Sequence, residues 1–204
     1  MPWLTLRYQD PYINKLSLLY DVEAIPTLVI VDAVGHVVNK RARTSIESDP
    51  LGTRFPYYPA PAQSLCDGVE SYGYDLNTKP TLVVLMENSS AAEQDAAISV
   101  LTQYGTALAK EKISEPGGPD MLFFYACKPS ENSHRVRVLC RLPRSSEEGP
   151  CPRMVILDVP DAGTFYLADG ISEEDEAVAF VTEESVAKFI EDFRSGTLTK
   201  RKLR

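Results

Sequence analysis

Cysteine is scarce in this sequence, and its few cysteines lie far apart. Cys66, Cys127, Cys140 and Cys151 leave no Cys-x-x-Cys pair among the 204 residues. A redox dithiol of that spacing and a zinc site built on paired cysteines are therefore excluded. We expect all four cysteines to be reduced thiols, as cysteines ordinarily are in a reducing compartment. We expect no metal and no cofactor.

Other absences narrow the class of protein. With 11 glycines and 15 prolines, the composition is neither collagen-like nor disordered. No apolar run reaches the roughly 18 residues that a membrane span needs, and the first residues lack a basic and then apolar leader. We therefore expect a soluble, intracellular protein. Basic residues are not in excess: the net charge is −8, and all of it lies beyond residue 55. The negative charge of the chain beyond residue 55 argues against binding to nucleic acid.

The first part of the chain carries the pattern of a small α/β unit. A short strand is predicted at 3–6 and a helix at 12–20, where apolar residues recur every three or four positions. The nearly all-apolar run 27–31 predicts a strand buried on both faces. Gly35 can supply the positive φ of a tight turn, after which 36–38 should return as an antiparallel partner.

The second part, which follows a proline-rich connector at 55–61, repeats this order at greater length. A buried strand is predicted at 81–86, and Ser90 with Glu93 forms a capping box at the head of a long helix. Gly105 lies within that helix at a cost of about 1 kcal/mol in helix propensity, which indicates close packing against a bulky neighbour.

Three strands and a helix complete the second part. The strands are predicted at 121–125, 153–158 and 164–167, and the last two should form an antiparallel pair. The final helix is capped by Thr182 and stops at Gly196. The second part therefore ends in strand, strand and helix.

The run Tyr-Asp-Val-Glu-Ala-Ile-Pro-Thr-Leu at 20–28, continuing into a strand and a hairpin, resembles the second half of a thioredoxin fold. In that family the proline follows a cis peptide bond and faces the redox dithiol, and the residue before it offers backbone groups to an extended substrate. The resemblance therefore marks Ile25, Pro26 and Thr27 as partner-binding residues. The alternative is a merely structural proline turn in another α/β fold.

The connector Phe-Pro-Tyr-Tyr-Pro at 55–59 is similar to the Phe-Pro-Trp type of sequence that ends the catalytic domain of nucleoredoxins and tryparedoxins. The implied fold class is α/β, thioredoxin-like, with a mixed central sheet between helices. The resemblance implies the C-terminal half of one unit at 1–58, a complete unit at 59–196 and a basic tail at 197–204. We expect this tail to be a frayed, solubilising end and not a nuclear-entry signal.

The resemblance also implies that the central strand and the dithiol of the first unit are missing from this chain. Either the strand at 3–6 pairs directly with 27–31, or apolar edges stay exposed. In the second unit, the position where a dithiol would open the helix is taken by 87–92, which hold no thiol. Pro152 matches the cis-proline step there, with a structural role favoured because no dithiol faces it.

The family consists of protein-disulfide reductases that regulate signalling in a redox-dependent way, of the Wnt and Dishevelled type. Since the Cys-x-x-Cys motif is absent, we assign no catalytic residue and expect a non-catalytic, protein-binding fragment or isoform. The expected partners are signalling proteins of the Dishevelled type, without nucleic acid or membrane, in the cytoplasm and nucleus. The alternative is a thiol-disulfide oxidoreductase that uses a lone cysteine such as Cys151 or Cys127.

Overall fold

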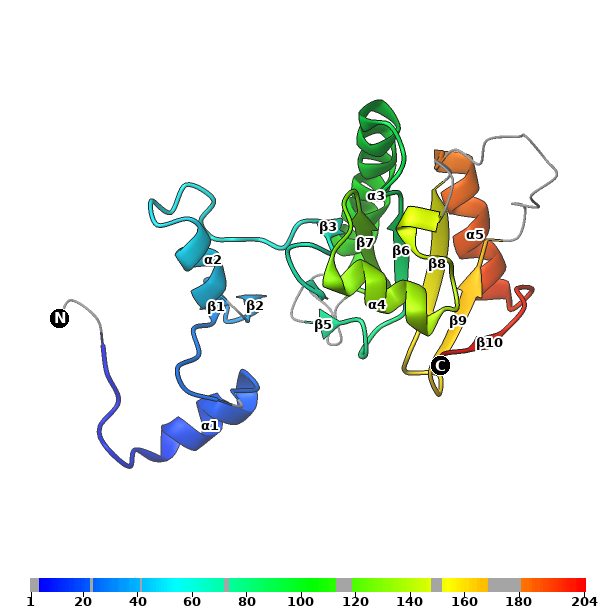
Figure 1. The fold of residues 1–204 in the computed structure, drawn as a ribbon. Coiled ribbons are helices and arrows are strands. Elements are labelled where there is room, and N and C mark those ends of the chain that lie inside the picture. Colours follow the sequence, from blue (N-terminus) through cyan, green and yellow to red (C-terminus); the bar gives the residue numbers. More distant parts are fainter. Residues whose placement is uncertain are drawn as a thin grey trace. The chain divides into compact units, whose positions relative to one another are not determined.

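The structure is a computed structural model that describes residues 4–22, 24–40, 42–71, 74–112, 119–147, 152–168 and 181–204. The chain divides into two compact units, Met1–Pro59 and Ala60–Arg204, and each is described by itself (Figure 1). None of the described helices is both long enough and apolar enough to cross a membrane.

The first unit consists of two helices and a small hairpin. Its elements are α1 (Pro11–Leu19), β1 (Ile30–Val31), β2 (Val37–Asn39) and α2 (Ala42–Ser48). Strands β1 and β2 pair antiparallel, which confirms the predicted hairpin, and α1 confirms the predicted helix. In the turn, the Asp32 carboxylate accepts hydrogen bonds from the backbone N–H groups of Val34 at 2.9 Å and His36 at 2.8 Å. Gly35 adopts the expected positive φ of 94°.

Two strand predictions for the first unit are wrong. Residues 4–7 form no strand, and Leu4 is fully exposed. Strand β1 occupies only the last two residues of 27–31, and Leu28 and Val31 are 43% and 40% exposed. A strand is buried on both faces only when neighbouring strands and helices cover it, and among the described residues β1 pairs with β2 alone. The structure therefore has the exposed apolar edges that were one of the two expected arrangements.

The second unit is built on six strands, which are β3 (Gln63–Ser64), β6 (Thr81–Leu85), β7 (Leu122–Ala126), β8 (Arg153–Asp158), β9 (Thr164–Leu167) and β10 (Arg201–Lys202). They form one sheet in the order β10-β9-β8-β6-β7-β3. Strand β6 pairs in parallel with β7 and antiparallel with β8, while β3 pairs in parallel with β7. Two short strands, β4 (Glu70–Ser71) and β5 (Tyr74–Asp75), form a separate ladder.

Helices cover both faces of this sheet (Figure 1). The long helix α3 (Ala91–Lys112) and the helix α5 (Glu183–Ser195) contribute to the core cluster on one face. Helix α4 (Glu131–Leu139) contributes to the cluster on the other face, and a short 3₁₀ turn, η1 (Ser145–Glu147), follows it. This is the mixed central sheet between helices that the resemblance implied.

Capping interactions mark the start of α3 and both ends of α5. The predicted capping box is confirmed: the Ser90 backbone N–H donates to the Glu93 carboxylate at 2.7 Å, and the Glu93 N–H donates to the Ser90 hydroxyl at 3.4 Å. Thr182 caps α5 by accepting from the Ser185 N–H at 3.1 Å, and Gly196 ends that helix with φ at 73°. The predicted termini of α5 are confirmed.

The glycine inside α3 lies against the main chain of the connector. A Cβ atom added at Gly105 would lie 2.2 Å from the carbonyl oxygen of Pro61 and 2.7 Å from its carbonyl carbon. Close packing is confirmed, but the neighbour is backbone and not a bulky side chain. The connector can cross the helix at this distance only because residue 105 has no side chain.

The C-terminal segment is ordered against the sheet, so the expectation of a frayed tail is wrong. Strand β10 pairs antiparallel with β9 at the edge of the sheet. The Leu203 N–H donates to the Gly163 carbonyl at 3.0 Å, and the Arg204 N–H donates to the Leu139 carbonyl at 3.2 Å. The Leu203 side chain packs against the core cluster on the α4 face. Apolar burial and backbone pairing together hold the tail.

Candidate functional site

The carboxyl ends of the parallel strands β6, β7 and β3 lie at one edge of the sheet, and the candidate site is built there. Strand β6 leads through Met86 into the loop 87–90, and α3 begins directly after it. This loop is where the resemblance would place a dithiol, and it reads Glu-Asn-Ser-Ser. The N-terminus of α3 is closed by its own capping box.

A buried ion pair occupies the first position of this loop. Glu87 accepts from Nη2 of Arg137 at 2.6 Å and from Nε at 3.1 Å, and the two side chains are 0% and 3% exposed. The remaining guanidinium nitrogen, Nη1, donates to the Pro143 carbonyl at 3.1 Å. A buried carboxylate is tolerated only when it is paired and hydrogen-bonded, as it is here. The pair joins the end of β6 to α4 across the edge of the sheet.

One amide side chain ties the ends of two strands to α3. Nε2 of Gln94 donates to the carbonyl oxygens of Met86 at 2.9 Å, Cys127 at 3.1 Å and Ser89 at 3.2 Å. Met86 follows β6 and Cys127 follows β7, so this amide fixes the spacing of the two strand ends. An amide nitrogen has only two hydrogens, so one of the three contacts is shared.

The cysteines of the second unit differ in exposure. Cys66 is exposed, Cys127 is partly buried and Cys140 is buried. Burial raises the pKa of Cys127, and the neighbouring Cys66 raises it further. Burial alone raises the pKa of Cys140 to about 12, so that thiol is protonated and unreactive at neutral pH. Cys151, the candidate lone redox thiol, lies outside the described residues, and so does the peptide bond that precedes Pro152.

The Ile-Pro-Thr step lies in the first unit, in the stretch that leads to β1. The Ile25–Pro26 bond is cis, as is the Phe55–Pro56 bond. The Ile25 side chain is 93% exposed, and the Thr27 hydroxyl donates to the Ala24 carbonyl. All three residues of the step are solvent-exposed, so their side chains are accessible to a partner.

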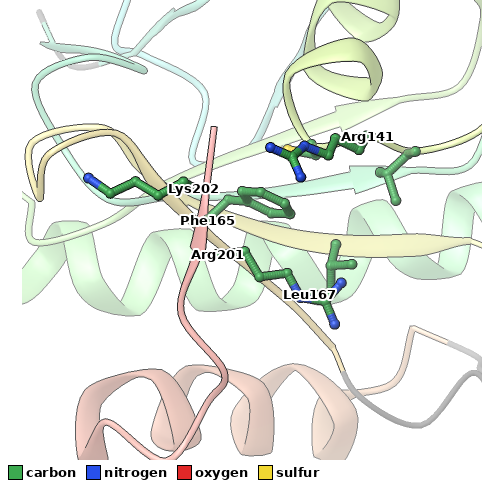
Figure 2. Close-up of a pocket in the computed structure, with 7 residues that line it drawn as sticks. Arg141, Phe165, Leu167, Arg201 and Lys202 are labelled. Atoms are coloured by element: carbon green, nitrogen blue, oxygen red, sulfur yellow. The ribbon is translucent and has the colours of Figure 1, made fainter. Parts of the chain in front are cut away.

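A groove on the second unit was not predicted from the sequence. It has a volume of about 370 Å³ and lies between the end of α4 and the strands β9 and β10 (Figure 2). The residues that line it are Cys140, Leu142, Phe165, Leu167 and the cations Arg141, Arg201 and Lys202. In Figure 2 the ring of Phe165 lies among the three basic side chains. The pairing of β10 with β9 brings Arg201 beside Phe165, which lies 36 positions earlier in the chain. The end of α4, about 60 positions before β10, completes the lining, which explains why no motif predicts the groove.

No group of three or more metal-ligating side chains comes together in the part of the chain that the structure describes. The functional groups described above at this edge of the sheet are a paired carboxylate, an amide and the thiols of Cys66 and Cys127. None of these, as placed, is an activated nucleophile at a helix N-terminus.

No protein-family model matches the chain. Among curated proteins, nucleoredoxin of Danio rerio is 28% identical over 192 residues, which cover 93% of this chain and 42% of that protein. Nucleoredoxin of Mus musculus is 29% identical over 195 residues, or 95% of this chain and 40% of that protein. Tryparedoxin of Trypanosoma brucei brucei is 39% identical over 59 residues, or 28% of this chain and 41% of that protein.

The chain spans about two fifths of the length of the nucleoredoxins that it matches. The match to them nevertheless covers nearly all of this chain, including both units. The mixed sheet between helices agrees with the same relationship. The chain is therefore a nucleoredoxin-like protein of the thioredoxin superfamily, with a thioredoxin-like fold.

Proposed function

We propose that this chain is a non-catalytic member of this redox family and that it binds protein partners. By resemblance, the partners are signalling proteins of the Dishevelled type, met in the cytoplasm and nucleus. The observation that carries the proposal is the buried pair of Glu87 and Arg137 at the head of α3. A carboxylate locked into an ion pair occupies the loop in which a reductase needs a thiolate.

Thiol-disulfide exchange requires an accessible thiolate, because the thiolate is the attacking species. Loop 87–90 offers none. Cys127 lies at the same edge, but burial raises its pKa, so it forms less thiolate at neutral pH than an ordinary cysteine does. Both observations argue against turnover at this edge of the sheet.

The groove between α4, β9 and β10 provides this function with a surface for a partner. Three cations surround an apolar floor, and no acidic side chain is among the described residues that line the groove. The chain as a whole carries a net charge of −8, so this basic surface stands out from its surroundings. Charge complementarity favours an acidic peptide segment as the partner, and an apolar side chain of that segment would pack against Phe165.

The exposed residues Ile25, Pro26 and Thr27 are the proposed contact of the first unit. The support for this is the 93% exposure of Ile25 and the family role of the step as a backbone ledge for an extended segment. A bound strand there would use main-chain hydrogen bonds, as in other cases of strand addition.

Insulin reduction tests the absence of catalysis. With dithiothreitol as electron donor, we expect the chain to precipitate insulin no faster than dithiothreitol alone. The chain has no Cys-x-x-Cys pair, and the raised pKa of its partly buried Cys127 lowers the fraction of that thiol present as thiolate. A thioredoxin with an intact dithiol is the positive control. Turnover above the background that is lost in a variant with all four cysteines replaced by serine would overturn the non-catalytic proposal.

Charge reversal in the groove tests the partner surface. We expect Arg201→Glu to weaken binding of a purified Dishevelled-type protein by about tenfold, which corresponds to about 1.4 kcal/mol. Lys188→Glu is the matched control, because Lys188 is exposed on α5 and does not line the groove. Binding would be measured by isothermal calorimetry at two salt concentrations. Equal losses in the two variants would mean that only net charge matters, and the groove would be ruled out as the site.

A further inference from the structure

Cys66 and Cys127 follow two strands that are direct neighbours in the sheet. The parallel register of β3 and β7 pairs Gln63 with Phe124 and Ser64 with Tyr125. The ladder continues for one more step, because the Leu65 N–H donates to the Tyr125 carbonyl at 2.8 Å. Leu65 therefore lies beside Ala126, and Cys66 follows it in the turn after β3, where the Asp67 N–H donates to the Ser64 carbonyl at 3.0 Å.

Both thiols lie near Tyr125, on the face of the sheet that α3 and α5 cover. Leu65 and Ala126 belong to the core cluster on the α4 face. Cys127 packs against the cluster on the opposite face. Tyr125 packs against that same cluster, and burial raises its pKa, which Cys127 and Cys66 raise further, so both thiols lie near the Tyr125 hydroxyl.

Contacts at the sulfur atoms agree with this placement. The Cys66 Sγ lies 3.9 Å from the carbonyl oxygen of Lys128, the residue that follows Cys127. The Cys66 N–H donates to the Ser64 hydroxyl at 3.1 Å, which holds the turn after β3. The two thiols are also close enough to interact electrostatically. Neighbouring strands such as β3 and β7 lie about 4.8 Å apart, so the turn after β3 starts within the roughly 4.4–6.8 Å between Cα atoms that a disulfide spans.

We propose that Cys66 and Cys127 are a redox pair that closes reversibly into a disulfide between β3 and β7. The oxidant is a low-molecular-weight disulfide such as glutathione disulfide. The Cys66 thiolate attacks one of its sulfurs, the S–S bond breaks, and glutathione leaves as a thiolate that takes up a proton. The Cys127 thiol then gives up its proton, its sulfur attacks Sγ of Cys66, the bond from that sulfur to glutathione breaks, and the second glutathione leaves as a thiolate that takes up the proton.

Atoms and electrons balance in this reaction. Two protein thiols are oxidised to one disulfide, and one glutathione disulfide is reduced to two glutathione molecules. Cys66 attacks first because it is exposed, while the partly buried Cys127 acts as the resolving thiol. The Gln94 amide, which donates to the Cys127 carbonyl, holds the resolving residue in place. This stoichiometric switch goes beyond the proposed binding function and does not depend on it.

The test is direct mapping of disulfides. The full chain is incubated with glutathione disulfide, free thiols are trapped by alkylation, and non-reduced peptides are analysed by mass spectrometry. We expect a peptide pair linked through Cys66 and Cys127. Cys127→Ser should instead accumulate a mixed disulfide with glutathione at Cys66, because its resolving thiol is gone. Cys140→Ser is the matched control and should keep the linked pair, since Cys140 is buried and its pKa is about 12.

Three results would overturn the proposal. They are the absence of a Cys66–Cys127 link in the unchanged chain, a stable glutathione adduct at Cys66 despite an intact Cys127, and a link from Cys66 to Cys151. The insulin assay gives an independent result, because a chain that forms the link without reducing insulin supports both proposals. Failure of partner binding leaves the mapped link unaffected.

Discussion

The Arg137→Met variant is expected to lose about 3–5 kcal/mol of unfolding free energy. Its guanidinium is 3% exposed and makes two hydrogen bonds to Glu87, whose side chain is 0% exposed. Removing it leaves a buried carboxylate without a counter-charge, which costs far more than the pair contributes when intact. The loss would be measured by urea denaturation followed by far-ultraviolet circular dichroism. Fluorescence is unsuitable because the single tryptophan, Trp3, lies in the first unit.

A second substitution shows whether the loss comes from the unpaired charge. In the double variant of Glu87→Leu and Arg137→Met, both charges are gone, and we expect most of the lost stability to return. Arg135→Met is the matched control, because Arg135 is an exposed arginine of the same helix, and we expect a change within about 0.5 kcal/mol. A double variant as unstable as Arg137→Met alone would contradict the role of the ion pair.

Gly105→Ala should destabilise the second unit by about 1–3 kcal/mol, although alanine is the better helix former. The new Cβ would lie 2.2 Å from the Pro61 carbonyl oxygen, a main-chain atom that cannot move by rotating a side chain. Either α3 or the connector must shift, and the cost of that shift exceeds the gain of about 1 kcal/mol in helix propensity. The same urea titration measures the effect.

Ser99→Ala serves as the control for this prediction. Ser99 is exposed on α3, so its substitution raises helix propensity without adding a contact, and we expect a small gain in stability. An alanine at position 105 that stabilised the unit as much as one at position 99 would falsify the close approach of the connector to the helix.

The second unit could be predicted largely from its sequence because local signals and tertiary packing agree there. The apolar run at 81–86 is long enough for a central strand, and β6 is buried at all five of its residues. Ser90 with Glu93 and Thr182 with Gly196 mark helix ends that the structure shares. Helix α4 was not predicted because its sequence is mostly polar, and one of its few buried residues is Arg137.

The first unit shows how the same reasoning fails. The run 27–31 has the composition of a buried strand, but composition states only what a strand could bury and not whether neighbours are present. With β2 as its one strand partner among the described residues, the run keeps Leu28 and Val31 partly exposed. Strand propensity depends on such context more than helix propensity does.

The candidate site was only partly predictable for a related reason. The loop 87–90 could be located as the thiol-free position because it follows a recognisable strand. The partner of Glu87 is 50 residues away, at Arg137, and no motif links them. The proposed pairing of Cys66 with Cys127 depends on β3, which places the following turn beside β7 and which, at two residues, is too short to be recognised from sequence alone.

The backbone amide protons of strand β6 should be among the slowest in this unit to exchange with solvent. All five of its residues are completely buried, and it is hydrogen-bonded to β7 on one side and β8 on the other. Such amides exchange with deuterium only when the whole unit opens, so their exchange rates report its global unfolding free energy. The exposed residues Asn88 and Ser90 lie within five positions of the strand's end. Hydrogen-exchange protection should therefore fall steeply between the end of β6 and the head of α3.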